Sequence, residues 1–117
     1  MEKKSETLRG YDAYKARLKS GENVKFRETG NSMVPKIYSR QECEYAPILT
    51  ADQVGKGDIV WCKVNGSHFT HLVTAKKQVR PGEFSFQISN NKGHANGWIG
   101  IENIFGKVVS VEGRPIR

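Results

Sequence analysis

Residues 58–76 have the sequence DIVWCKVNGSHFTHLVTAK, and this stretch decides the fold. Two runs rich in β-branched and aromatic residues, 58–64 and 68–76, flank the dipeptide Asn65-Gly66. Such runs favour β-strands, and Asn-Gly favours the positive φ angles of a two-residue hairpin turn. We therefore expect these two strands to pair antiparallel as a hairpin.

Similar short runs lie on both sides of this hairpin, separated by Gly, Asn and Pro. The tripeptide Arg80-Pro81-Gly82 is typical of a tight turn that links the second strand of the hairpin to the next strand. The sequence therefore predicts a compact, mainly β fold of antiparallel strands. The other strands are expected at residues 24–28, 42–48, 83–89 and 107–111.

The N-terminal segment has a helical pattern instead. Between residues 5 and 20, apolar side chains recur three or four positions apart, and Gly21 can end a short amphipathic helix there. A chain of 117 residues is long enough for one hydrophobic core. We expect an N-terminal helix or arm over residues 1–22, one β domain over residues 23–112 and a C-terminal tail over residues 113–117.

Charge and composition restrict the partners only broadly. The net charge of +7 would attract nucleic acid or acidic proteins without specifying a sequence or a partner. No apolar run approaches the ~20 residues that cross a bilayer, and the charged N-terminus lacks a secretory leader, so we expect a cytoplasmic protein that uses no membrane. Cys43 and Cys62 are isolated from other metal-ligand residues, so we expect no metal site and no cofactor.

One turn could present a nucleophile. In Gly30-Asn31-Ser32-Met33-Val34-Pro35, a small hydroxyl lies between a flexible glycine and a rigid proline, directly after a predicted strand. Such a turn could hold Ser32 with backbone N–H groups directed to one point, as acyl transfer requires. The same six residues are also compatible with an ordinary polar turn.

A histidine in the predicted hairpin could serve as the base. Strict alternation in residues 68–76 places His71 with Phe69, Val73 and Ala75 on the more apolar face of the strand. A neutral imidazole in such a place could accept the proton of a serine hydroxyl. The alternative is a core histidine with a purely structural hydrogen bond.

The ordered motifs between residues 30 and 109 resemble the LexA and signal-peptidase superfamily of serine peptidases. Within it, Ser39-Arg40-Gln41 and the run from Asn90 to Trp98 most resemble the small proteins of bacteriophages and prophages. The matching blocks are Gly30-Asn31-Ser32-Met33-Val34-Pro35, Lys56-Gly57-Asp58-Ile59-Val60, His71-Leu72-Val73, Ile88-Ser89-Asn90-Asn91 and Ile104-Phe105-Gly106-Lys107-Val108-Val109. The resemblance implies a LexA-like β fold.

The resemblance also implies roles for single residues. Ser32 would attack a peptide carbonyl, His71 would act as general base, and backbone N–H groups around Gly30 and Ser32 would receive the oxyanion. The rest of the nucleophile motif, Asn31, Met33 and Pro35, would position the serine. Where histidine-using relatives place an acidic residue to orient the base, this sequence offers Asn90, Asn91 or Asn96.

The implied activity is that of a serine endopeptidase acting on a soluble protein or peptide in a bacterial or phage-infected cell. An alternative is a catalytically inactive phage-type module that uses the same fold and its basic surface to bind a host regulatory protein or nucleic acid. A third possibility is nonspecific nucleic-acid binding, with Trp61, Phe84 and Phe86 stacking on bases.

Overall fold

The computed structural model describes residues 10–116, and within them it confirms a mainly β, antiparallel fold with a short N-terminal helix. The helical segments are α1 (Tyr11–Lys19) and the short 3₁₀ turns η2 (Ala51–Gln53) and η3 (Ile101–Asn103). The strands are β1 (Val24–Arg27), β2 (Glu42–Pro47), β3 (Ile59–Val64), β4 (Ser67–Arg80), β5 (Glu83–Ser89), β6 (Ala95–Gly100), β7 (Ile104–Val111) and β8 (Arg114–Pro115).

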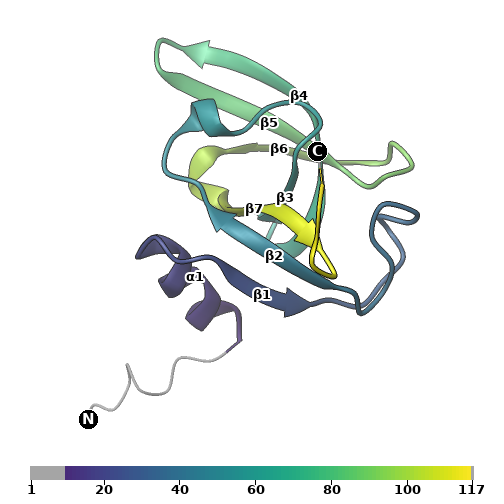
Figure 1. The fold of residues 1–117 in the computed structure, drawn as a ribbon. Coiled ribbons are helices and arrows are strands. Elements are labelled where there is room, and N and C mark those ends of the chain that lie inside the picture. The colour runs from purple at the N-terminus through teal and green to yellow at the C-terminus, as the bar shows by residue number, and fades with distance from the viewer. Residues whose placement is uncertain (1–9, 117) are drawn as a thin grey trace.

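The strands form one sheet in the order β1-β2-β7-β3-β4-β5-β6, with β8 paired to β7. As the Asn65-Gly66 dipeptide predicts, β3 and β4 form an antiparallel hairpin, and both turn residues have positive φ, 50° and 84°. The second predicted turn is also present, because Arg80 and Glu83 pair across Pro81-Gly82. In Figure 1 this β4–β5 hairpin projects from the top of the molecule.

Strand β3 is buried on both faces and separates two hydrophobic clusters. Ile59 and Trp61 pack with residues of α1, β1, β2 and β7, whereas Val60 and Cys62 pack with residues of β4, β5 and β6. This alternation follows from the two-residue period of a strand. The sheet therefore curves around β3, and helix α1 adds Leu18, which is buried, to the first cluster.

The curvature brings two distant loops together. The loop that follows β1 and the turn between β5 and β6 lie side by side at the right of Figure 1. A backbone hydrogen bond joins them, from the N–H of Asn91 to the carbonyl of Ser32 at 2.9 Å. The turn that contains Ser32 is therefore attached to the far edge of the sheet, more than fifty residues later in the chain.

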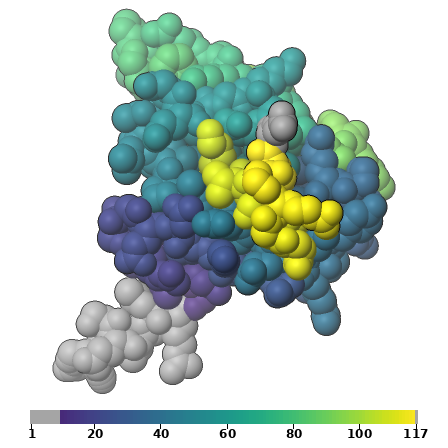
Figure 2. Space-filling view, viewed as in Figure 1, coloured from purple at the N-terminus to yellow at the C-terminus, as the bar shows by residue number. Residues whose placement is uncertain are grey.

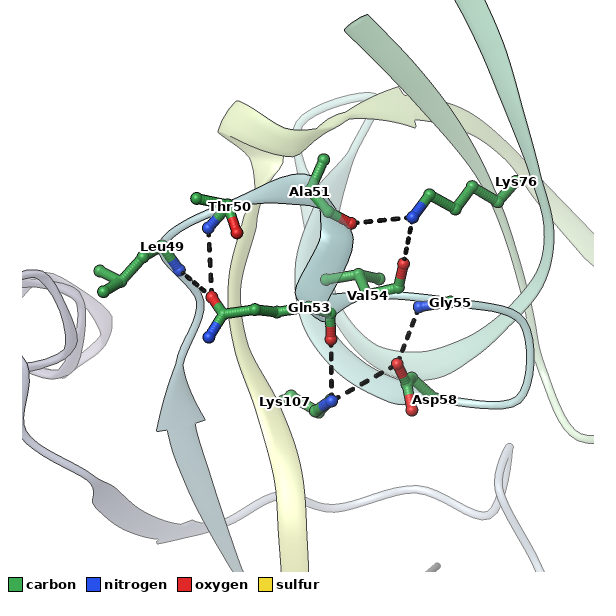
Figure 3. Close-up of polar contacts among 9 residues, drawn as sticks. All are labelled: Leu49, Thr50, Ala51, Gln53, Val54, Gly55, Asp58, Lys76 and Lys107. Carbon is green, nitrogen blue, oxygen red and sulfur yellow. Dashed lines mark hydrogen bonds and ion pairs between the residues drawn. The ribbon is translucent and has the colours of Figure 1, made fainter. Parts of the chain in front are cut away.

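Two lysines fix the connection between β2 and β3 (Figure 3). The ammonium group of Lys76 donates to the carbonyls of Ala51 and Val54 at 2.9 and 2.8 Å. Lys107 donates to the carbonyl of Gln53 at 2.8 Å and lies 3.6 Å from the Asp58 carboxylate. Both lysines therefore satisfy backbone carbonyls at the end of η2.

The structure has two strands that the sequence did not predict, β6 and β8. Strand β6 was not expected, because residues 95–100 include two glycines and an asparagine, which have low β-propensity. The expected C-terminal tail contributes β8, which lies with the end of β7 on the surface in yellow in Figure 2. Helix α1 ends before Gly21 as expected, and the part of the expected helix at residues 5–9 lies outside the described residues.

Within residues 10–116, no helix is both long enough and apolar enough to span a bilayer.

Candidate active site

Ser32 lies in a tight turn within the loop that joins β1 to β2. The carbonyl of Met33 accepts hydrogen bonds from the N–H groups of Lys36 and Ile37 at 2.8 and 3.0 Å, which closes the turn. The Met33 side chain is buried in the first hydrophobic cluster, while Ser32 itself is exposed. Met33 therefore anchors the turn and leaves the adjacent hydroxyl accessible.

His71 faces this hydroxyl from β4. Its Nε2 atom lies 2.9 Å from the Oγ of Ser32, within hydrogen-bond distance. The imidazole is 5% exposed and stacks on Phe69, with ring centroids 4.7 Å apart. His71 and Phe69 are on the same face of β4, as the alternation predicts, so the packing of one ring orients the other.

Asn96 holds the other side of the imidazole through a β-bulge. Ile88 of β5 pairs with Gly97 and Ser89 pairs with Ala95, so Asn96 is an extra residue without a partner in the ladder. A bulge of this kind redirects a side chain, and the Oδ1 of Asn96 lies 2.7 Å from the Nδ1 of His71. Of the three asparagines, Asn96 is the one hydrogen-bonded to the histidine.

The other two asparagines hold loops rather than the base. Asn91 donates from its backbone to the carbonyl of Ser32 at 2.9 Å, and from its side chain to the carbonyl of Val34 at 3.0 Å. The Oδ1 of Asn90 accepts the N–H groups of Lys92 and His94, each at 2.9 Å. Asn90 thus closes its own turn, and Asn91 ties that turn to the serine.

The backbone around Ser32 provides donors, though not at Gly30. The N–H of Gly30 donates to the Oγ of Ser39 at 3.0 Å, so in this conformation it is already paired. Within residues 10–116, the N–H groups of Ser32 and Met33 donate to no protein acceptor. Asn31 and Pro35 are exposed on either side of the turn.

The protonation of His71 follows from its surroundings. Because the Oδ1 of Asn96 can only accept, the Nδ1 atom carries the proton and Nε2 presents a lone pair to Ser32. Burial lowers the pKa of His71 below its ordinary value of 6.5, against smaller opposing effects of the Asn96 hydrogen bond and the Glu28 charge. The histidine is therefore neutral at pH 7.

A cleft of about 370 Å³ opens beside these two residues. Its lining includes a carboxylate that the sequence did not reveal, that of Glu28, directly after β1. A single charged residue at a strand end usually faces solvent, so no local signal distinguishes it. Its partners come from other segments: Thr70 of β4 and Tyr11 of α1.

The aromatic residues considered for base stacking are unsuited to it. Trp61 and Phe86 have no exposed surface, and Phe84 is half-buried, with the Lys76 ammonium 4.8 Å from its ring centroid. Base stacking needs an accessible ring face. The structure thus contradicts this use of Trp61 and Phe86.

The described part of the chain forms neither a metal site nor a reactive thiol. Within residues 10–116, no three His, Cys, Asp or Glu side chains come together in a way that could hold a metal ion. Cys43 and Cys62 are free thiols, and burial raises the pKa of each, to about 11 and about 12. They therefore stay protonated and unreactive at neutral pH.

No family model, curated protein or solved structure matches this chain.

Proposed function

We propose that this chain is a serine peptidase in which Ser32 is the nucleophile and His71 is the general base. The observation that carries the proposal is the contact of 2.9 Å between the Oγ of Ser32 and the Nε2 of His71. A hydroxyl is a weak nucleophile until an adjacent base accepts its proton. Here the base is neutral and buried, and its other nitrogen is held by Asn96.

The reaction would proceed as acyl transfer. The Oγ of Ser32 forms a bond to the carbonyl carbon of a peptide, and its proton moves to Nε2 of His71. The imidazolium then gives this proton to the leaving amine as the C–N bond breaks, and water hydrolyses the acyl-enzyme by the same steps. The free N–H groups of Ser32 and Met33 are the candidate donors to the oxyanion.

Asn96 would orient the base without neutralising it. An amide oxygen fixes the tautomer of His71, but it stabilises the imidazolium less than a carboxylate would. Burial lowers the pKa of His71, and the negative charge of Glu28 opposes this lowering. That charge therefore supplies part of the stabilisation of the imidazolium. We therefore expect a slow enzyme rather than an inactive one.

In this chain, a serine follows β1 and a histidine lies on the β3–β4 hairpin. This is the order of blocks on which the resemblance rests, and it supports the proposed relationship to the LexA and signal-peptidase superfamily. The substrate would be a protein or peptide in the cytoplasm. Neither Ala-Gly nor Cys-Gly, the bonds cut in self-cleaving members, precedes Ser32. We propose cleavage of another chain rather than self-cleavage.

One observation favours the second candidate, a binding module that keeps this fold without the chemistry. The N–H of Gly30 is already bonded to Ser39, so one of the expected oxyanion donors is missing. Such a module would bind a host protein and would not need the hydroxyl of Ser32.

Covalent labelling separates the two candidates. Wild-type protein, Ser32→Ala and His71→Gln are treated with an alkyl fluorophosphonate, and intact mass is measured. Ser67→Ala is the matched control, because Ser67 is also exposed but lies at the start of β4 and does not line the cleft beside Ser32. We expect one adduct on the wild type and on Ser67→Ala, none on Ser32→Ala, and little on His71→Gln.

A wild-type protein that takes up no adduct between neutral and alkaline pH would favour the binding module. A positive result is followed by digestion of a denatured bacterial protein extract with wild-type or Ser32→Ala protein. New peptide termini that depend on Ser32 would establish peptidase activity, whereas labelling without them would indicate another serine hydrolase.

A further inference from the structure

The cleft beside Ser32 is lined by the carboxylate of Glu28, which accepts hydrogen bonds from two neutral hydroxyl groups. The Oε1 of Glu28 accepts the hydroxyl of Thr70 at 2.6 Å, and the Oε2 accepts the hydroxyl of Tyr11. The Thr70 oxygen is in turn 2.9 Å from the hydroxyl of Tyr45. Since the single Thr70 proton goes to Glu28, Tyr45 must be the donor to Thr70.

This network hydrogen-bonds both carboxylate oxygens without pairing the charge of Glu28. Within residues 10–116, no Lys or Arg nitrogen lies within 4.0 Å of Glu28. Arg27 also lines the cleft, but it pairs with Glu112 at 3.0 Å instead. Each oxygen of Glu28 uses one acceptor position for a neutral hydroxyl and keeps another. A half-buried carboxylate without a cation is unfavourable, so a bound cation would be stabilised here.

The charge of Glu28 affects other groups around the cleft. Burial raises the pKa of Tyr11 to about 12, together with the smaller effects of the hydrogen bond to Glu28 and of its charge. Burial raises the pKa of Tyr45, and the charge of Glu28 adds to this rise. Burial lowers the pKa of His68, and the same charge opposes this lowering. A positive group that enters the cleft would meet this field close to Ser32.

The walls of the cleft also suit a long cationic side chain. Tyr11 and Tyr38 line it and are 38% and 51% exposed, and Phe69 lines it next to His71. Aromatic faces attract ammonium and guanidinium groups, and they cover the aliphatic stems of Lys and Arg.

We propose that this cleft binds a lysine or arginine side chain of the substrate, with Glu28 as its counter-ion, next to the bond that Ser32 attacks. This inference rests on the proposed peptidase function and names its substrate class. It is opposite to what the net charge of +7 alone would favour, which is an acidic peptide. The preference for a basic residue is therefore a local property of Glu28.

Competition with fluorophosphonate labelling tests this specificity. Three short peptides that differ only in a central Lys, norleucine or Glu compete with the probe at Ser32. For the wild type, we expect the Lys peptide to slow labelling at about tenfold lower concentration than the norleucine peptide, and the Glu peptide to be weakest. Glu28→Gln should remove the Lys preference, and Glu83→Gln, which changes an exposed carboxylate on the β4–β5 hairpin, should keep it.

Binding to Ser32→Ala protein, followed by NMR shifts of backbone amides, separates this inference from the proposed function. Lys-peptide shifts at residues 28 and 70 that depend on Glu28 would support the cationic subsite even if no labelling occurs. Normal labelling with equal competition by the Lys and norleucine peptides would overturn the subsite and leave the peptidase intact. If Glu28→Gln folds poorly, the three peptides are still compared on the wild type. The preference for Lys over norleucine is then tested without the variant.

Discussion

The backbone N–H of Asn91 donates to the carbonyl of Ser32 at 2.9 Å, and the Asn91 side chain donates to Val34 two residues later. The turn between β5 and β6 thus holds the nucleophile turn at two points. Because Asn96, the partner of His71, follows in β6, one segment positions both members of the proposed dyad. The loop after β1 and the turn between β5 and β6 are therefore held together as one unit.

Replacing Asn91 with Ala should loosen that unit without unfolding the domain. The variant loses the side-chain bond to Val34 but keeps the backbone bond to Ser32, so the free energy of unfolding should fall by about 1 kcal/mol. Fluorophosphonate labelling of Ser32 should slow several-fold. Asn103→Ala is the control, since the Asn103 side chain forms no hydrogen bond within residues 10–116. Equal labelling rates in the two variants would contradict the positioning role of Asn91.

Replacing Asn96 with Asp should strengthen the base. A carboxylate keeps the acceptor for Nδ1 and adds a charge that stabilises the imidazolium, so the pKa of His71 should rise. Labelling should become about tenfold faster at a pH above that pKa, and Asn96→Leu should be slower than wild type by a similar factor. The measurements are labelling rates against pH and NMR titration of the His71 ring. An unchanged His71 pKa in Asn96→Asp would show that residue 96 does not face the imidazole.

Stability should depend on pH through His71. Burial lowers its pKa in the folded state below the unfolded value of 6.5, so between these two values the unfolded chain binds more protons. The contribution of neutral His71 is therefore complete above about pH 6.5 and is lost as the pH falls toward the folded pKa. Urea denaturation at about pH 8 and about pH 5 should show a smaller loss in His71→Gln than in wild type. An equal loss in His71→Gln and wild type would contradict this role of His71.

Replacing Gly97 with Ala should disturb the bulge. Gly97 has a φ of 145°, which side-chain-bearing residues rarely adopt, and an added Cβ would lie 3.3 Å from a methyl group of the buried Val64. We expect a loss of about 1–3 kcal/mol in the free energy of unfolding, together with slower labelling because Asn96 moves. Gly55→Ala, at a site with open space and no positive φ, should change neither. Loss of stability without loss of labelling would mean that the bulge does not position Asn96.

The parts of the fold that could be predicted are those with local signals. Asn65-Gly66 fixes a hairpin by its own φ preferences, and the register of that hairpin places His71 on the buried face. Ser32 could be singled out because Gly30 and Pro35 flank it. In each case, the deciding residues are neighbours in the sequence.

The rest depends on contacts between distant segments. Strand β6 exists because β5 and the buried Ile99 hold it, although its glycines disfavour a strand. The choice among three asparagines depends on a bulge, whose position follows from the register of β5 and β6 and not from the spacing of the asparagines. Glu28 has a role only because α1 and β4 bring Tyr11 and Thr70 to it.

The bulge at Asn96 also bears on how such a domain could change over time. Asn96 is the one residue of β6 without a partner on β5, so the ladder on either side does not need it. A single-codon deletion there could remove the histidine's partner while sparing the sheet and both hydrophobic clusters. The proposed chemistry and the sheet thus depend on different residues of β6, and a descendant could lose the first and conserve the second.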